Sequence, residues 1–386
     1  MSNLLLESRW NETKDALLEG LQGGKRTAMG VILENTRKHL METASSGATA
    51  AGNVATLNRV ILPVIRRVMP TVIANEIVGV QPMTGPVGQI HTLRVRYAEA
   101  NATDSVNPGD EALSPFKIAT SYSGASTGKA AATAALEGVG GSKLNVQILK
   151  QTVEAKTRKL SARWTFESAQ DAQAMHGIDV EAEIMAALAQ EITAEIDQEI
   201  LASLRSLAAT EETFNQAGVS GTATFVGDEH AALAVLINRV ANKIAQRTRR
   251  GAGNWAVVSS ESLTVLQSAT TSAFARTTEG TFEAPTNTKF VGTLNGAMKV
   301  YVDSYAADGQ AVLVGYKGAS ESDAAAFYCP YIPLMSSGVV LDPTTFEPVV
   351  SFMTRYGYVE LSNTANSLGN AGDYLGEIAV SNVSFS

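Results

Sequence analysis

Two glycine-rich stretches come close to phosphate-binding motifs, so nucleotide chemistry is the first possibility to test. Residues 124–129, GASTGK, are similar to a phosphate loop, but only three residues separate the glycines, and Ala130 stands where Ser or Thr should hold magnesium. Residues 251–256, GAGNWA, have dinucleotide-site spacing, but they follow a predicted helix and precede a predicted strand. That order is the reverse of the one required. We expect no nucleotide site at either stretch and a turn at the second.

The side chains that could bind a metal or attack a substrate are scattered along the chain. The histidines show no metal-ligand spacing; they are His39, His91, His176 and His230. Cys329 has no histidine near it in sequence, which favours a buried structural thiol. Four carboxylates lie near glycine-rich turns without calcium-loop spacing: Asp303, Asp308, Glu321 and Asp323. No catalytic, cofactor or metal residue is predicted, and only a pocket joining Cys329 to a histidine would make an enzyme plausible.

The composition excludes several classes of protein. The chain has 386 residues, of which 45% are hydrophobic and 18% charged, with a net charge of −8. It can therefore bury a large core in two or three domains. The only basic run is Arg247, Arg249 and Arg250, which argues against nucleic-acid binding as the main role. One cysteine allows no intrachain disulfide, the apolar runs are too short to span a membrane, and the N-terminus does not resemble a signal peptide.

The elements that must position any site begin with two amphipathic helices, predicted at residues 3–21 and 26–42. Residues 44–53 are small, polar and without pattern, which predicts a flexible joint. We expect everything before this joint to be able to leave without disrupting a core. Residues 87–97 alternate, with Leu93 and its neighbours at odd positions on one face, which predicts a strand with one buried face.

Residues 98–143 are rich in glycine and too long for an ordinary loop inside a compact domain. We expect an extended two-stranded arm, which would be marginal alone and would need another subunit to lie on. The return limb is predicted at residues 144–166. Its alternation changes phase across residues 156–159, which predicts a bend or bulge there.

Residues 178–207 predict the most regular helix, because an apolar residue recurs every fourth position from Ile184 to Leu204. Such a stripe drifts by about 40° per step and winds around a helix roughly 45 Å long. Glu191, Glu195 and Glu199 form a parallel acidic stripe, predicted to be a solvated face.

An α/β module is predicted after this helix. Its parts are a helix at 228–247, a strand at 255–259, a helix at 261–268, and strands at 289–303 and 310–317 with a turn at Asn295-Gly296. The last strands are predicted at 325–332 and 346–361. The tail beyond Ser362 is polar and rich in Gly and Asn.

Three segments of the chain resemble the major head proteins of T-even-like contractile-tailed bacteriophages. The first runs from RRVMP at 66–70 to GVQPMTGP at 79–86, and the second is RRGAGNW at 249–255. The third contains VGYKG at 314–318, Asp323-Ala324 and Tyr328 to Tyr331, and continues through Asp342-Pro343 and FEPV at 346–349 to TRYG at 354–357. The matches keep the same order over about residues 60–360, which makes them specific as a set.

The resemblance implies an α+β protein with the Hong Kong 97-type capsid fold. That fold has an N-terminal arm, an extended β-loop, a peripheral domain with a long spine helix, and an axial α/β domain. In this chain the helical arm, a candidate for processing, would be 1–53, the start of the peripheral domain 54–97, and the extended loop 98–160. The peripheral domain with the spine helix would continue over 161–227 and the axial domain over 228–320. The return strands of the peripheral domain and the C-terminal tail would be 321–386.

The implied function is that of a non-enzymatic major capsid protein without cofactors. It would form hexamers and pentamers, close an icosahedral head shell around phage DNA without sequence-specific binding, and be assembled in the host bacterial cytoplasm. Scaffold, portal, vertex and decoration proteins are further candidate partners; no membrane is expected. The alternatives are an encapsulin-like compartment shell and another self-assembling phage structural protein, such as a tail sheath.

In the resembled family a prohead protease cuts after glutamate, with Leu or Ile two residues before it. In the first 42 residues this pattern fits Glu7, Glu19, Glu34 and Glu42; elsewhere it fits only Glu377. Glu42 is the strongest candidate for the final cut because it lies beside the flexible stretch. The alternative is that amphipathic helices produce such triplets by chance.

Overall fold

The computed structural model divides the chain into two compact units. Unit 1 comprises Met1–Gly88, Val153–Ala202 and Phe327–Val359, and unit 2 comprises Gln89–Thr152, Ser203–Ala326 and Glu360–Ser386. The residues that the structure describes are Trp10, Lys14, Asp15, Leu18, 26–35, 73–110, 112, 119–124, 130–137, 141–176, 179–219, 226–269, 274–276, 289–321, 323–345, 347–362 and 370–383. The joint predicted at 44–53 lies outside these residues.

Unit 1 is built on a five-stranded sheet with β11 and β13 at its centre. The strands are β1 (Gly79–Val80), β4 (Lys156–Arg163), β11 (Ala326–Ser336), β12 (Val340–Leu341) and β13 (Pro348–Glu360). β1 runs parallel to β11, while β4 and β12 run antiparallel to β13. The strands predicted at 325–332 and 346–361 are thus confirmed, with small shifts at their ends.

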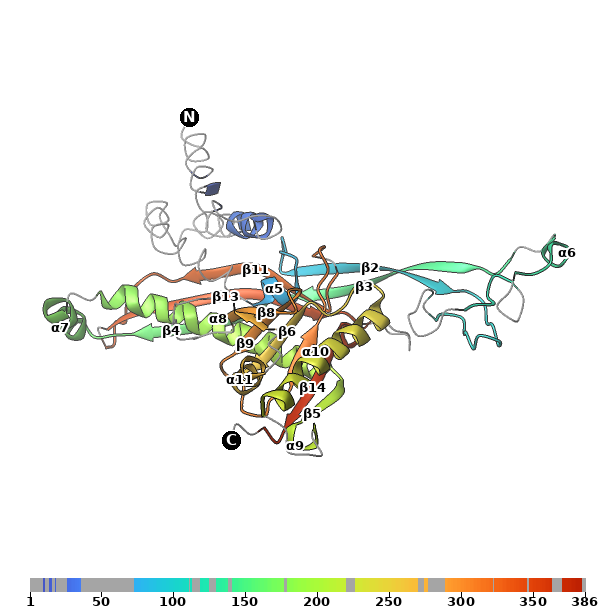
Figure 1. The fold of residues 1–386 in the computed structure, drawn as a ribbon. Helices are drawn as coiled ribbons and strands as arrows, with labels where there is room; N and C mark the ends of the chain where they lie inside the picture. The colour runs from blue at the N-terminus through green and yellow to red at the C-terminus, as the bar shows by residue number, and fades with distance from the viewer. Residues whose placement is uncertain are drawn as a thin grey trace. The chain divides into compact units, whose positions relative to one another are not determined.

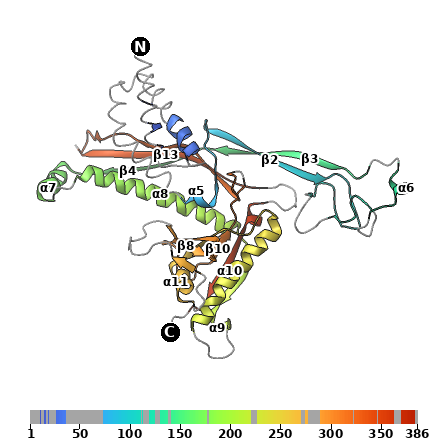
Figure 2. The ribbon, with the colours of Figure 1, turned by 45° about the horizontal axis from the view of Figure 1, so that its top comes forward.

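The long helix predicted at 178–207 is α8 (Val180–Leu207), which follows α7 (Phe166–His176). α8 lies along β4 and β13 in both ribbon views (Figures 1 and 2). Its residues Ile192, Ile196 and Ile200 are almost fully buried, as the four-residue apolar repeat predicted. The short helix α5 (Ala74–Ile77) joins the same unit, since the Ile73 N–H before it donates to the buried carboxylate of Asp197 at 2.9 Å.

The first helical segments are packed into unit 1 rather than separable from it. Residues 26–35 are helical, and Met29, Ile32 and Leu33 are 3%, 1% and 1% exposed. The expectation that everything before residue 44 could leave without disrupting a core is therefore wrong for this segment. Helical periodicity shows which face is apolar, but it does not show that the same chain buries that face.

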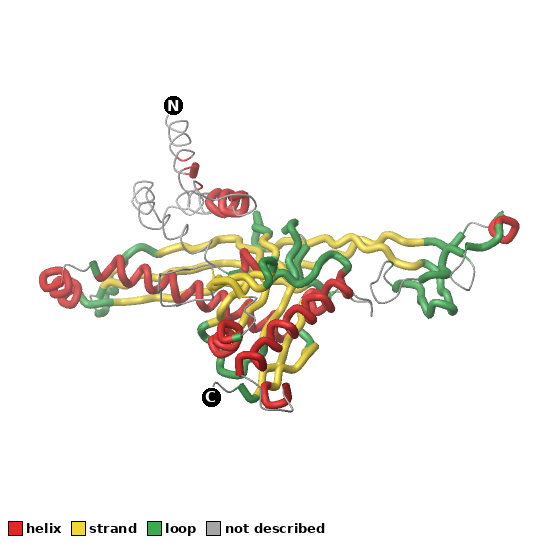
Figure 3. The backbone as a smooth tube through the Cα atoms, viewed as in Figure 1, coloured by secondary structure: helices red, strands yellow, loops and turns green. Residues whose placement is uncertain are grey.

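Unit 2 contains a seven-stranded sheet. In sheet order its strands are β5 (Thr210–Asn215), β14 (Leu375–Ser381), β10 (Val312–Gly315), β6 (Trp255–Ser259), β9 (Met298–Asp303), β8 (Lys289–Leu294) and β7 (Phe274–Arg276). The apolar residues of α10 (Val226–Thr248) and α11 (Ser260–Ser268) share one core with its strands. The short α9 (Gln216–Val219) and the 3-10 turn η1 (Ala371–Tyr374) also belong to unit 2, whose helices and strands Figure 3 colours red and yellow. The predicted α/β module is therefore present.

The turn predicted at Asn295-Gly296 joins β8 to β9. Asn295 has φ of 53° and Gly296 has φ of 71°, and two consecutive positive φ angles are what a tight hairpin of this kind requires. The stretch 251–256 is the turn between α10 and β6, as predicted, and not a dinucleotide site.

The two-stranded arm exists, and its return strand begins at residue 144 as predicted, but its outgoing strand is the predicted strand 87–97 rather than part of 98–143. β2 (Val87–Tyr97) and β3 (Leu144–Glu154) form a separate two-stranded sheet, which we call the ribbon (Figure 1). Residues 98–143 include the short helix α6 (Thr133–Leu136) and a small core of their own, made by Tyr97, Val106, Ala112 and Tyr122. The alternation of residues 87–97 predicted a strand, but nothing in that pattern shows that the strand pairs with residues 144–154.

Three further elements differ from expectation. The return limb breaks at Ala155, one residue before the predicted bend, and it ends at Arg163, since α7 already begins at Phe166. β5 was not predicted. The tail beyond Ser362 is not only a polar extension, because β14 lies inside the seven-stranded sheet between β5 and β10. A short strand whose neighbours are distant in sequence gives little local signal.

Candidate assembly surfaces

The ribbon presents an apolar face that its own chain leaves open. The Ala98 N–H donates to the Lys143 carbonyl at 3.1 Å and the Ala155 N–H to the Pro86 carbonyl at 2.9 Å, which fixes one antiparallel register along the ribbon. This register places Leu93 directly opposite Ile148, on one face, in a pair whose side chains approach closely.

The exposed apolar side chains on this face, which we call the ribbon face, are Leu93, Leu144, Val146 and Ile148. They are 69%, 53%, 64% and 66% exposed. The prediction that residues 87–97 have a buried face is thus wrong for Leu93. Contiguous apolar groups of this kind on a soluble surface mark interaction sites. Their signal was present in the sequence, since Leu144, Val146 and Ile148 alternate with polar residues.

A second exposed apolar group lies in unit 1, where β11 leads into β12. Val339, Val340 and Leu341 are consecutive and exposed, and the last two form β12, which pairs with β13 at Val349 and Pro348. These three side chains form a second surface that another molecule could cover.

The segments that resemble phage head proteins meet in space within each unit. In unit 2 the Asn254 side-chain amide donates to the Lys317 carbonyl at 2.6 Å, and the Lys317 N–H donates back to Asn254 Oδ1 at 3.0 Å. Arg250 donates to the carboxylate of Asp323. The second and third resembling segments therefore form one contact site.

Glycine is required at that site by close approach. A Cβ on Gly315 would lie 2.1 Å from the indole ring of Trp255, and one on Gly251 would lie 2.6 Å from the ring of Tyr316. In unit 1 the first resembling segment contacts the third through a backbone hydrogen bond, which the Gln81 N–H donates to the Tyr328 carbonyl at 3.0 Å. The matching residues thus maintain packing rather than assemble reactive groups.

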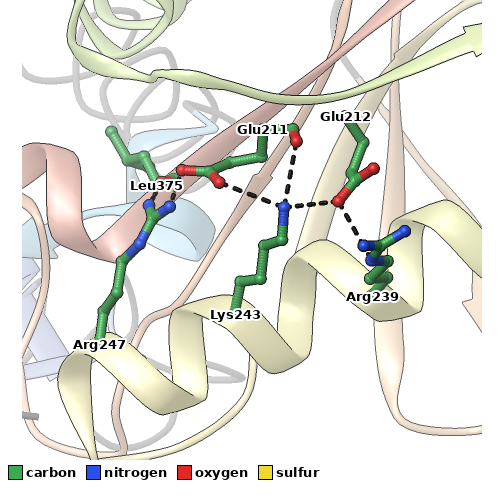
Figure 4. Close-up of polar contacts among 6 residues, drawn as sticks. All are labelled: Glu211, Glu212, Arg239, Lys243, Arg247 and Leu375. Carbon is green, nitrogen blue, oxygen red and sulfur yellow. Dashed lines mark hydrogen bonds and ion pairs between the residues drawn. The ribbon is translucent and has the colours of Figure 1, made fainter. Parts of the chain in front are cut away.

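A charged network holds α10 against β5, as Figure 4 shows. Lys243 donates to both Glu211 and Glu212, Arg239 Nε lies 3.1 Å from Glu212 Oε1, and Arg247 pairs with Glu211. The hydrogen bond from Lys243 holds the pKa of Glu212 below its usual value. The network therefore uses carboxylates to neutralise the cations that α10 presents.

A second charged cluster joins α8 to the sheet of unit 1. Arg158 on β4 donates to Glu195 and Glu199 at 2.6 Å each and to the Tyr356 hydroxyl at 2.6 Å. Glu191 and Glu195 are exposed, as predicted for a solvated face, while Glu199 is half-buried. Glu195 and Glu199 both bind the Arg158 cation. Burial raises the pKa of Glu199, but hydrogen bonds from Tyr356 and Arg158 outweigh it and lower that pKa overall.

The reactive side chains that the structure describes lie on separate elements. Cys329 is buried in β11, and burial raises the pKa of its thiol to about 12, so it is not a nucleophile at neutral pH. His230 is buried beside Ser268, with 2.6 Å between Nδ1 and Oγ, and His91 is exposed on the ribbon. His39 lies outside the described residues, as do 125–129 of the phosphate-loop-like stretch.

The predicted acidic group is also dispersed. Separate basic side chains bind three of its members: Asp303 with Arg205, Glu321 with Lys317, and Asp323 with Arg250. Among the described residues, no three potential metal ligands lie together. No helix in the described part of the chain has the length and apolar content needed to cross a bilayer.

Of the four candidate cleavage residues, the structure describes only Glu34. Its carboxylate accepts hydrogen bonds from Trp10 Nε1 at 3.2 Å and Lys14 Nζ at 3.4 Å. Glu7, Glu19 and Glu42 lie outside the described residues, so the preference for Glu42 stays a prediction.

Comparison with known proteins gives consistent matches. The family model described as "Major capsid protein Gp23" matches residues 54–142 and 112–380. The major capsid protein of Vibrio phage KVP40 is 30% identical, over 83% of this chain and 80% of that protein. The major capsid protein of Enterobacteria phage T4 is 30% identical, over 82% of this chain and 77% of that protein.

Solved structures of phage proteins also align, at low identity. The capsid of Myoviridae phage XM1 covers 78% of this chain and 89% of its own, with 10% identity and a TM-score of 0.42. A chain from Mycobacterium phage Cain covers 81% of this chain and 91% of its own, with 11% identity and a TM-score of 0.45.

The curated relatives are structural components of the phage virion rather than enzymes. The α+β elements follow the order that the resemblance implied: extended ribbon, long helix, inserted α/β module and return strands. By sequence similarity over most of its length, the chain belongs to the Gp23 family of phage major capsid proteins.

Proposed function

We propose that the chain assembles with copies of itself into hexameric and pentameric capsomers, which close into an icosahedral head shell around phage DNA. Family membership supports this proposal, and one structural observation carries it. The ribbon face stays exposed in the part of the chain that the structure describes, with four apolar side chains between 53% and 69% exposed. A neighbouring copy is the surface that would cover it.

The energetics of the ribbon fit this role. A two-stranded ribbon is marginally stable alone, so contact with a neighbour also stabilises its own pairing. Burying a Leu, Val or Ile side chain contributes about 1.5–3 kcal/mol. Association costs roughly 4–15 kcal/mol in lost freedom, so one ribbon contact is weak. A closed shell repeats the contact many times, and multivalency converts weak contacts into a stable particle.

The parts of the fold take the following roles in the proposal. Unit 1 is the peripheral domain with α8 as its spine helix, the seven-stranded sheet of unit 2 is the axial domain, and the ribbon is the extended loop. Expansion of the shell after packaging is a rigid-body change of these parts. The N-terminal arm reorients at residues 44–53 and is processed after one of the four candidate glutamates.

In this proposal the shell encloses DNA without a dedicated phosphate-binding site. In the basic run, Arg247 pairs with Glu211 and Arg250 pairs with Asp323. Phosphate binding needs clustered free cations. Scaffold, portal, vertex and decoration proteins remain the further partners that we propose.

The test replaces the ribbon face and leaves the fold alone. We expect Leu93→Glu combined with Ile148→Glu to give soluble, folded protein that forms no shells by electron microscopy, because a neighbour would have to bury two carboxylates. Gln147→Glu is the matched control, since Gln147 is exposed on the opposite face of β3 and assembly should persist. Normal shells from the double variant would remove the ribbon face from the account. Deleting residues 104–140 should likewise leave soluble protein without shells.

A further inference from the structure

The helical segment 26–35 is attached to unit 1 by a specific polar contact as well as by its apolar face. The Asn35 side-chain amide donates to the Met83 carbonyl at 2.7 Å and lies 3.5 Å from the Tyr331 carbonyl. The Met83 N–H donates to the Pro330 carbonyl, so Asn35 joins the segment after β1 to β11. Asn35 is 9% exposed, and a buried amide bonded in this way is costly to release.

An earlier segment of the chain, in which the structure describes Trp10, Lys14, Asp15 and Leu18, also contacts residues 26–35. Leu18 is 6% exposed, and its Cδ1 lies 3.8 Å from where a Cβ on Gly30 would be, so the two segments are in contact. Trp10 and Lys14 both bind the Glu34 carboxylate from this segment. Glu34 is therefore paired with the segment that carries Trp10, Lys14 and Leu18, while its side chain remains 35% exposed.

These contacts restrict what a glutamate-directed protease could reach around Glu34. The two residues before Glu34, Ile32 and Leu33, are 1% exposed each, and Asn35 after the bond donates to Met83. The Glu34 carboxylate accepts two hydrogen bonds, although its side chain is 35% exposed. The bond also lies in or directly beside a helix, whereas a protease binds an extended chain. Local opening must therefore precede any cut.

We propose that the Glu34–Asn35 bond is a closed processing site, which becomes cleavable only when segment 26–35 leaves unit 1. This inference rests on the processing included in the proposed function. Release of the Asn35 amide from Met83 is the controlling step, and the apolar contacts of Ile32 and Leu33 set how rarely it occurs.

The test uses the unassembled full-length chain and a glutamate-specific endopeptidase that recognises only the residue before the cut. Mass spectrometry follows the fragment that begins at Asn35, and each rate is divided by the rate in the denatured chain, which corrects for sequence preference. Asn35→Ala should raise the normalised rate about two- to tenfold, the effect of losing one buried hydrogen bond. Ile32→Ala should raise it at least about thirtyfold through the loss of core packing.

Two controls separate local release from general instability. Lys14→Ala removes only a part-exposed ion pair and should change the normalised rate by less than about threefold. Cleavage after Glu195, on α8 of the same unit, should stay slow in both docking variants. The proposal is overturned if the native chain is cut after Glu34 as fast as the denatured chain. It is also overturned if the docking variants leave that rate unchanged, or if they accelerate Glu34 and Glu195 equally.

Shell formation is scored separately by electron microscopy. A failure of the assembly test therefore does not alter the protease result, and failure of the protease test leaves the ribbon-face proposal standing.

Discussion

Strand β13 and the ribbon have the same kind of sequence and opposite surroundings. In β13, Val350 and Phe352 alternate with more accessible residues and are 1% exposed each, inside the core of unit 1. In the ribbon, Val146 and Ile148 alternate in the same way and are about two-thirds exposed. Alternation in the sequence thus predicts that a strand has an apolar face and a polar face, but it does not show which segment packs on the apolar face. For β13 that segment belongs to the same chain; for the ribbon we propose that it belongs to another copy.

The strongest test of the comparison is a truncation in the covered strand. We expect Phe352→Ala to lower the free energy of unfolding by about 3–5 kcal/mol, because it leaves a cavity in the core of unit 1. Denaturant unfolding measures this loss. Met353→Ala, on the other face of β13, should cost less than half as much; equal losses would mean that the two faces do not differ.

A smaller effect is expected where β13 passes the base of the ribbon. A Cβ on Gly357 would lie 2.3 Å from Val153 Cγ1 and 3.2 Å from the Glu154 carbonyl oxygen. Gly357→Ala should therefore destabilise unit 1 by about 1–3 kcal/mol through overpacking, seen as a lower midpoint of thermal unfolding. Gly85→Ala is the matched control, because its nearest neighbour would be 3.9 Å away. An unchanged midpoint for Gly357→Ala would show that the close approach is relieved.

Unfolding at acidic pH should show how much the ion pairs of α10 contribute to holding this helix on the sheet of unit 2. Lys243 lowers the pKa of Glu212 from its usual 4.5, so this pair contributes stability above about pH 4.5 and loses it as pH falls through the lower folded-state pKa. Glu212→Gln should cost less than about 1 kcal/mol at neutral pH. It should also make the loss of stability between about pH 5 and pH 3 shallower. Unfolding curves with the same pH slope in both proteins would contradict this role.

The smallest effect on stability is expected in the ribbon itself. Ile148→Thr keeps a β-branched residue at an exposed position and should change the unfolding free energy by less than about 0.5 kcal/mol. Ile90→Thr is the contrast, because Ile90 is 8% exposed on the opposite face of β2 and should cost about 1–3 kcal/mol. A large loss for Ile148→Thr would mean that the chain already covers its own ribbon face.

Strong periodicity made several elements predictable from the sequence. The repeat from Ile184 to Leu204 predicted α8 to within two residues, and the apolar run from Trp255 predicted β6. β14 was missed because its burial depends on β10 and β5, which lie far away in the sequence. α7 was missed because it is polar on most sides and offers no apolar stripe.

The sequence predicted which kinds of surface the chain has, but not which contacts form them. The sequence predicted an arm that needs a neighbour and a return limb from residue 144, yet it did not show that residues 87–97 form the outgoing strand, because the pairing of β2 with β3 spans the whole tip. It also predicted Glu34 as one of four equivalent triplets. The docking of its segment depends on Asn35 reaching Met83 and Tyr331, contacts between residues too distant for any local pattern to show.

The most direct measurement is the accessibility of the ribbon face before and after assembly. Cys329 is the only natural cysteine, and it is 2% exposed, so Ile148→Cys provides one reactive thiol for maleimide labelling. Free subunits should label rapidly at position 148, and assembled shells should resist labelling there. A thiol that labels equally fast in shells, or that is already protected in the free chain, would contradict the claim that copies of the protein cover this face.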